Sequence, residues 1–148
     1  MRVQFEVIGE RATVQTVRDL GQFDWSQFHR RAAIYMQRSI RQGVYSGKDL
    51  DGRPFAPLSI VTQQAKRGSK RRGSAHILVD RGDMLKSLIP SSNAREGRVA
   101  IGDRMNQIKG RAHNFGTRNM PRRSWFGIRK ADIEVIEGMA GDAQRRVS

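Results

Sequence analysis

The stretch DWSQFHRRAAIYMQRSIRQG, residues 24–43, carries the clearest periodic pattern in the sequence. Asp24 and Gln27 have the spacing of a capping box at the start of a helix, and Gly43 is a typical residue at a helix end. The polar positions, among them His29, are interpreted as a solvated face. We therefore predict a long amphipathic helix whose buried stripe recurs every three or four residues: Trp25, Phe28, Ala32, Met36 and Ile40.

Short strand patterns lie on both sides of this helix in the sequence. Residues 1–7 alternate apolar with polar side chains, as in a half-buried strand. Residues 76–80, HILVD, begin as a short strand and then turn into a brief helix. Residues 88–92 and 97–102 are expected to pair as a hairpin across a short polar connection.

The last part of the chain has helical spacing again. Ile133, Ile136, Met139 (or Ala140) and Ala143 fall on one side of a helix, although nearby glycines weaken it in isolation. Together these patterns predict a single α+β domain over residues 1–148. Its long amphipathic helix packs on a small, mainly antiparallel sheet, and a C-terminal helix follows.

Composition excludes several classes of protein. The 148 residues include no cysteine, so disulfides, thiolate nucleophiles and zinc–cysteine sites are absent, and three scattered histidines make a weak metal set. No segment has the apolar length that a bilayer requires, and the first residues lack the apolar core of a signal peptide. We expect a soluble protein made in the cytoplasm, without cofactor, metal or membrane.

The positive charge is concentrated in two windows. The net charge is +14, and almost all of the excess lies in residues 66–72 and 104–130, which contain basic residues and no acid. Such a field suits a polyanion or an acidic partner, although a solvated loop that aids solubility has the same composition. Glycine, serine and mutual repulsion predict a mobile loop at about residues 66–74. The partner- or DNA-facing residues expected in it are Lys66, Arg67, Lys70, Arg71 and Arg72.

The stretch RAHNFGTRNMPRRSWFGI, residues 111–128, mixes one histidine with aromatics and arginines. We interpret His113, Gly116 and Pro121 as a structural turn, with a histidine ring nitrogen held by a backbone carbonyl, in preference to a catalytic or metal-binding role. Phe115, Trp125 and Phe126 are interpreted as core or subunit-contact residues, although aromatics beside arginines also bind single strands. The arginines of the proline-containing loop are expected to face a partner or DNA: Arg118, Arg122 and Arg123.

Five short motifs occur in a recognisable order. They are DGRPFAPLSIVT, ILVDRGDMLKSL, VAIG, RAHNFG and MPRRSWFGI, between residues 51 and 128. In this order they resemble the tail-completion or virion-morphogenesis proteins of Mu-like and related tailed bacteriophages, over about residues 34–136. The chain departs from the family pattern at Arg81, at Gly110–Arg111, at Asn114 and in the Pro121–Ser124 segment.

The resemblance implies a structural subunit that completes the phage tail or joins it to the head, and it implies no catalytic residue. We expect a homo-oligomeric ring in the virion, beside other neck or tail proteins and with non-specific contact to passing DNA. One alternative is a free-standing nucleic-acid-binding protein that uses residues 66–72 and 104–130. A second is a hydrolase using Asp80 and Asp83, or Asp49 and Asp51, but these carboxylates have no recognised metal-site spacing.

Overall fold

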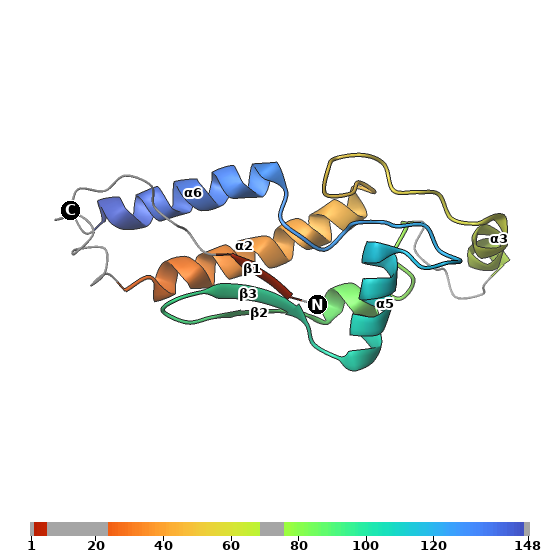
Figure 1. Cartoon of the computed structure of the whole chain (residues 1–148), viewed down its shortest axis with the longest axis horizontal. Helices are drawn as coiled ribbons and strands as arrows, with labels where there is room; N and C mark the ends of the chain where they lie inside the picture. Colours follow the sequence, from red (N-terminus) through yellow and green to blue (C-terminus); the bar gives the residue numbers. More distant parts are fainter. Residues whose placement is uncertain (1, 6–23, 69–75, 147–148) are drawn as a thin grey trace.

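The computed structural model describes residues 2–5, 24–68 and 76–146. Helix α2 (Ser26–Tyr45) lies between a three-stranded sheet on one side and α6 (Lys130–Arg145) on the other (Figure 1). These three layers, which we call the body, follow the predicted α+β arrangement. The other helices are α3 (Ile60–Gly68), α4 (Asp83–Lys86) and α5 (Arg104–Phe115).

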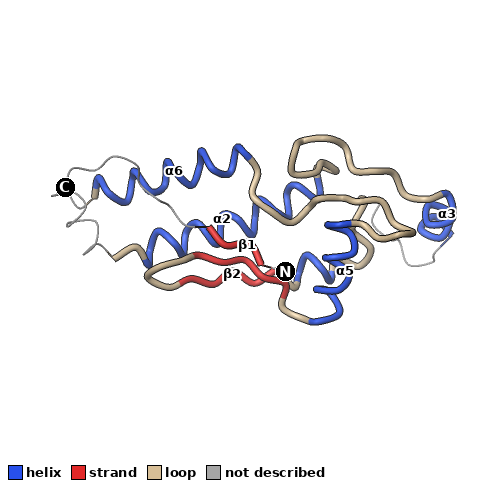
Figure 2. The backbone as a smooth tube through the Cα atoms, viewed as in Figure 1, coloured by secondary structure: helices blue, strands red, loops and turns tan. Residues whose placement is uncertain are grey.

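The sheet is antiparallel throughout, with strand order β1-β3-β2 (Figure 2). Strands β2 (Leu88–Ser92) and β3 (Gly97–Ile101) form the expected hairpin, and β1 (Arg2–Phe5) pairs with the other edge of β3. The hairpin turn is closed by Asn93, whose side-chain oxygen accepts from the backbone N–H groups of Arg95 and Glu96 at 2.8 and 3.0 Å. This local closure explains why the hairpin was predictable.

The apolar stripe of α2 is confirmed at Phe28, Ala32, Met36 and Ile40, which are all buried, whereas Trp25 precedes the helix and is only partly buried against the same core. The predicted ends of the helix are wrong. The Oδ1 atom of Asp24 accepts from the backbone N–H of Ser26 at 2.9 Å, and Gln27 takes no part.

Gly43 does not end α2, which continues to Tyr45. Instead, Gly43 makes room for a side chain from another element: a Cβ atom there would lie 1.6 Å from an Arg129 guanidinium nitrogen. The Nη1 atom of Arg129 also donates to the Ser39 carbonyl at 3.2 Å. The glycine therefore marks a helix contact rather than a helix end.

The solvated-face interpretation of α2 is wrong for His29. Its side chain is buried, and its Nδ1 lies 3.1 Å from the carbonyl oxygen of Asn93 in the hairpin turn. Arg41 donates from Nε to the Leu85 carbonyl at 3.1 Å, whereas Arg38 is exposed as expected. Polar side chains of α2 thus hold the hairpin and α4 in place beside the apolar stripe.

Helix α6 is fixed to α2 by a buried carboxylate. The Oδ1 atom of Asp132 accepts from the hydroxyls of Tyr35 and Ser39, and its Oδ2 accepts from the Arg129 N–H at 2.8 Å. Burial, together with the Asp132 carboxylate, raises the pKa of Tyr35 to about 12. The predicted apolar stripe of α6 is correct at Ile136 but wrong at Ile133, which is 48% exposed because the buried face is centred on Asp132 instead.

The predicted strand at residues 76–80 is absent, and this segment forms turns. Leu78 has a φ of 69°, which a strand cannot contain. The carbonyls of His76 and Val79 accept from the Nζ of Lys66 at 3.1 and 2.8 Å. A side chain from α3 thus takes hydrogen bonds that a strand would use for its ladder.

Candidate functional site

Described parts of both basic windows, residues 66–68 and 117–123, belong to one extended part of the molecule, which we call the arm (residues 56–68 and 117–123). Figure 1 shows the arm projecting beyond the end of the sheet, with α3 near its tip. Among the arm residues whose burial the structure describes, Arg123 is the buried one. The arm is therefore organised differently from the body.

Arg123 holds the two segments of the arm together. Its Nε donates to the Ala56 carbonyl at 2.8 Å, and its Nη2 donates to the Pro57 carbonyl at 2.9 Å. The prediction that Arg123 faces a partner or DNA is wrong, because the residue is 5% exposed and its guanidinium binds the chain's own backbone. A planar guanidinium with several donors suits two successive carbonyls.

Lys66 is likewise an anchor. Its Nζ binds the carbonyls of residues 76 and 79, so it tethers α3 to the segment before α4. Arg67 is exposed at the end of the same helix. Lys70, Arg71 and Arg72, with the rest of the predicted mobile loop beyond Gly68, lie outside the described residues.

Arg118 and Arg122 are exposed on the other segment of the arm, as expected of residues that meet a partner. Their turn is shaped by Gly116, which has a φ of 76° and approaches Arg122 so closely that a Cβ would lie 2.9 Å from its backbone nitrogen. Thr117 and Met120 exchange backbone hydrogen bonds of 2.9 and 3.2 Å, and the exposed Pro121 follows directly. Together with Arg67, these two arginines form the basic tip.

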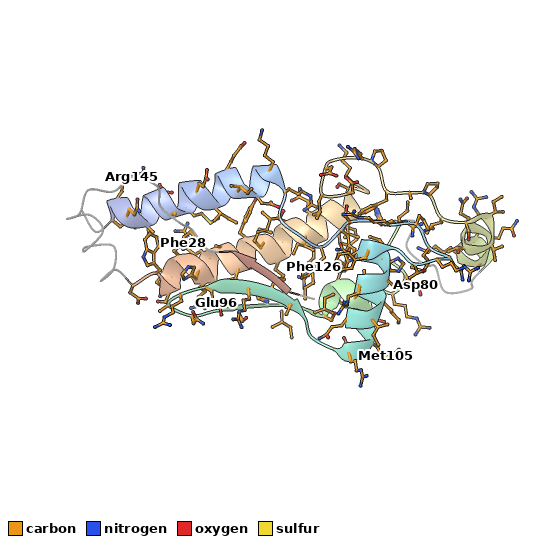
Figure 3. All side chains as sticks on the ribbon, in the orientation of Figure 1. Phe28, Asp80, Glu96, Met105, Phe126 and Arg145 are labelled. Carbon is orange, nitrogen blue, oxygen red and sulfur yellow. The ribbon has the colours of Figure 1, made fainter. Side chains whose placement is uncertain are left out.

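The aromatic residues divide into two kinds. Trp125 and Phe126 are core residues, with Trp125 fully buried and Phe126 near the centre of the molecule (Figure 3). Phe115 is 61% exposed at the end of α5 and remains a candidate for subunit contact.

Asn114 is the residue whose importance sequence reasoning missed. Its side-chain oxygen accepts from the backbone N–H groups of Trp125 and Phe126, both at 3.0 Å. The Trp125 indole N–H donates to the Gly110 carbonyl at 3.1 Å. These bonds seat α5 on the segment after the arm. In the sequence, Asn114 was visible only as a departure from the family pattern.

His113 contributes to the turn through its backbone rather than its ring. Its carbonyl accepts from the Arg123 N–H at 2.8 Å, while the buried Nδ1 has no hydrogen-bond partner among the described residues. Burial and the positive charge of Arg123 lower the pKa of His113. The ring therefore favours its neutral form.

The carboxylates considered for a hydrolase are only partly brought together. Asp80, Asp83 and His113 line one open cavity of about 360 Å³, together with Lys109 and Asn106, whereas the other two carboxylates lie elsewhere. Across residues 2–5, 24–68 and 76–146, no three histidine, aspartate or glutamate side chains are grouped as metal ligands.

A comparison with protein-family models shows to which family the chain belongs. The model described as the phage virion morphogenesis family matches residues 11–143. The chain belongs to this family. Neither a curated protein nor a solved structure matches it.

Membership of the phage virion morphogenesis family makes the protein a component for building the virion, with other virion proteins as its partners. It also points to a structural rather than an enzymatic role. In the described part of the chain, no helix is both long and apolar enough to cross a bilayer.

Proposed function

We propose that the protein is a structural subunit of the phage neck or tail terminus, which completes the tail or joins it to the head as a ring. The match to the virion morphogenesis family over residues 11–143 carries this proposal. A heterologous contact between identical subunits makes a ring when its rotation closes, and a ring suits the end of a tube through which DNA passes.

The basic tip supports a position next to DNA. Arg67, Arg118 and Arg122 are exposed at the end of the arm, and the basic residues 70–72 follow α3 in the sequence. DNA that slides through a ring presents every sequence in turn. Contacts to it should therefore reach phosphates without reading bases, and salt should weaken them steeply.

The test of the role is particle assembly without this protein. Host cells infected with phage lacking the gene should accumulate filled heads and tails that do not join. Adding purified protein to the mixed extracts should restore infectious particles. Normal particles from the deletion phage would overturn the proposed function.

The test of the first basic window, residues 66–72, uses one multiple variant. Arg67, Lys70, Arg71 and Arg72 are replaced together by glutamine, and Lys66 is kept because it anchors α3. We expect a folded protein that forms particles with reduced assembly or DNA retention. Infectious particles at normal yield would show that these charges serve solubility alone.

A free-standing nucleic-acid-binding protein is the second candidate, since the same exposed arginines would serve it. Such a protein should bind DNA as a monomer or dimer, with an affinity that falls strongly as salt rises. A joining protein should instead form a larger ring or bind isolated tails or heads. Measuring mass and DNA affinity on one sample, across a salt series, separates the two.

A further inference from the structure

We infer that the outer face of α5 in one subunit docks on the outer face of α6 in a second copy of the same chain. The inference rests on the proposed function, because it supplies the contact from which a ring would be built. It follows from the exposed side chains of the two helices, their opposite charges and their separate places in the subunit.

Helix α5 presents an apolar stripe that nothing in the described subunit covers. Met105, Ile108 and Phe115 are 62%, 54% and 61% exposed, and their spacing puts them on one side of the helix with Ala112 between. The opposite side carries Gly110 and Asn114, which are buried. Figure 3 shows Met105 at the outer edge of the molecule.

Helix α6 presents a face of a different kind, where Gly138 is uncovered and the Arg145 side chain lies close to Gly141. Glu134, Gly138 and Gly141 follow one another on the side opposite Asp132 and Ile136. A Cβ built on Gly138 meets no atom within 4 Å, so packing inside the described subunit does not require a glycine there. Glycine in an exposed helix interior is less favourable than alanine. Close packing of a second helix against this position would explain why a glycine is present there.

The charges on the two faces are opposite. The α5 stripe is flanked by Arg104, Lys109 and Arg111, and α5 contains no acid. In this strongly basic protein, the α6 face carries Glu134 and Glu137, which make no ion pair within the described part of the chain. Its basic residues lie at the helix ends, where Arg145 pairs with Asp142. Such complementarity favours this pairing and disfavours α5 against α5.

The contact has to form between subunits. Figure 1, viewed down the shortest axis, places α6 along one side of α2 and α5 beyond the end of the sheet on the other side. The 12 residues of α5 and the 16 of α6 correspond to about 18 and 24 Å, so the faces have comparable lengths. Each subunit carries one α5 face and one α6 face, so head-to-tail repetition in a closed ring buries every such face.

The first experiment changes the glycine. Purified full-length protein is studied by analytical ultracentrifugation and thermal unfolding, with Gly138→Ala and Gly138→Leu as variants. We expect Gly138→Ala to unfold at a higher temperature, since it removes the helix penalty. Gly138→Leu should unfold at no lower a temperature than the wild type, since leucine also removes the helix penalty, but it should lose self-association at least tenfold. Unchanged association of Gly138→Leu, or a wild-type protein that stays monomeric up to millimolar concentration, would overturn the inference.

The second experiment reverses the charges. Glu134→Lys with Glu137→Lys, and separately Lys109→Glu with Arg111→Glu, should each weaken self-association at least tenfold, because like charges then face each other. Mixing the two reversed proteins should restore association. A mixture that stays as weak as either protein alone contradicts the pairing of α5 with α6.

The extract assay keeps the two proposals apart. If Gly138→Leu and the charge-reversed proteins self-associate like the wild type, and the deletion phage still fails to join heads to tails, the α5–α6 contact is wrong and the joining function stands. If the mixture of reversed proteins associates as expected and the deletion phage still forms normal particles, the contact stands and the joining function is wrong.

Discussion

The body and the arm are held together by different chemistry. In the body, α2 buries an unbroken apolar stripe against the sheet, with Phe28, Met36 and Ile40 almost inaccessible. In the arm, the apolar side chains of Ile60 and Val61 face solvent, and the bonds of Arg123 and Lys66 to backbone carbonyls are not accompanied by such a stripe. Arg41 and Arg129 also donate to backbone carbonyls, but they do so beside the apolar stripe of α2. Positive charge in this protein therefore has two uses, one inside the subunit and one at its surface.

The largest effect should come from the body. Phe28→Ala removes a buried ring from the α2 stripe and should lower the free energy of unfolding by about 3–5 kcal/mol. Arg38→Ala, on the exposed side of the same helix, is the matched control and should change it little. Denaturant titration measures both. Equal, small losses would mean that the stripe contributes no more than the solvated face.

In the arm, the buried cation should matter next. Arg123→Met removes the hydrogen bonds to the Ala56 and Pro57 carbonyls, and we expect the arm to open more easily by about 1.5–3 kcal/mol. Hydrogen exchange in residues 58–68 measures this opening. The adjacent Arg122→Met, which removes an exposed arginine, should leave the exchange unchanged. Equal protection of residues 58–68 from hydrogen exchange in the two variants would show that Arg123 does not hold the arm closed.

A smaller loss is expected at Lys66. Lys66→Met breaks two hydrogen bonds of a half-buried ammonium and should cost about 1 kcal/mol of local stability in α3. Its neighbour Arg67→Met should be neutral for stability while weakening DNA binding. Hydrogen exchange and a salt-dependent binding assay read the two effects separately. If Arg67→Met lost stability and Lys66→Met lost only DNA binding, Arg67 would be the anchor and Lys66 the surface charge.

A still smaller effect is expected from His113 in α5, whose carbonyl accepts from the backbone N–H of the arm residue Arg123. Its pKa is lowered in the folded state, so the unfolded chain binds the proton more readily and stability falls as pH drops below about 6.5. The contribution is complete above that pH and is lost as pH falls towards the folded pKa. His113→Gln should flatten this part of the stability curve. NMR titration of Arg123→Met should show a higher His113 pKa, and an unmoved pKa would contradict the role of Arg123.

We expect no cleavage in a nuclease assay. The cavity beside the arm contains Asp80, Asp83 and His113 without a matched metal-ligand set among the described residues. We expect purified protein to leave DNA and RNA intact with magnesium, manganese or zinc. Reproducible cleavage, lost on replacing any of these three residues, would make the cavity an active site and overturn the structural role.

Sequence reasoning succeeded where the determinant is local. The stripe of α2, the hairpin and the turn at Gly116 all depend on residues within a few positions of one another. It failed at Arg123, Lys66 and His29, because a basic side chain looks the same in sequence whether it meets solvent or a backbone carbonyl. The Arg123 partners lie 66 and 67 residues away, a distance over which periodicity carries no information.

The Asp132 carboxylate also affects the order in which contacts form while the chain is being synthesised. It accepts hydrogen bonds from the hydroxyls of Tyr35 and Ser39, which lie 97 and 93 residues earlier in the chain. While the ribosome is still making the intervening sequence, α2 has neither this acceptor nor the α6 surface that covers it. Contacts of such long separation form late and slow folding. We therefore expect nascent chains halted before residue 132 to leave one side of α2 open to chaperones, so that few subunits assemble before synthesis is finished.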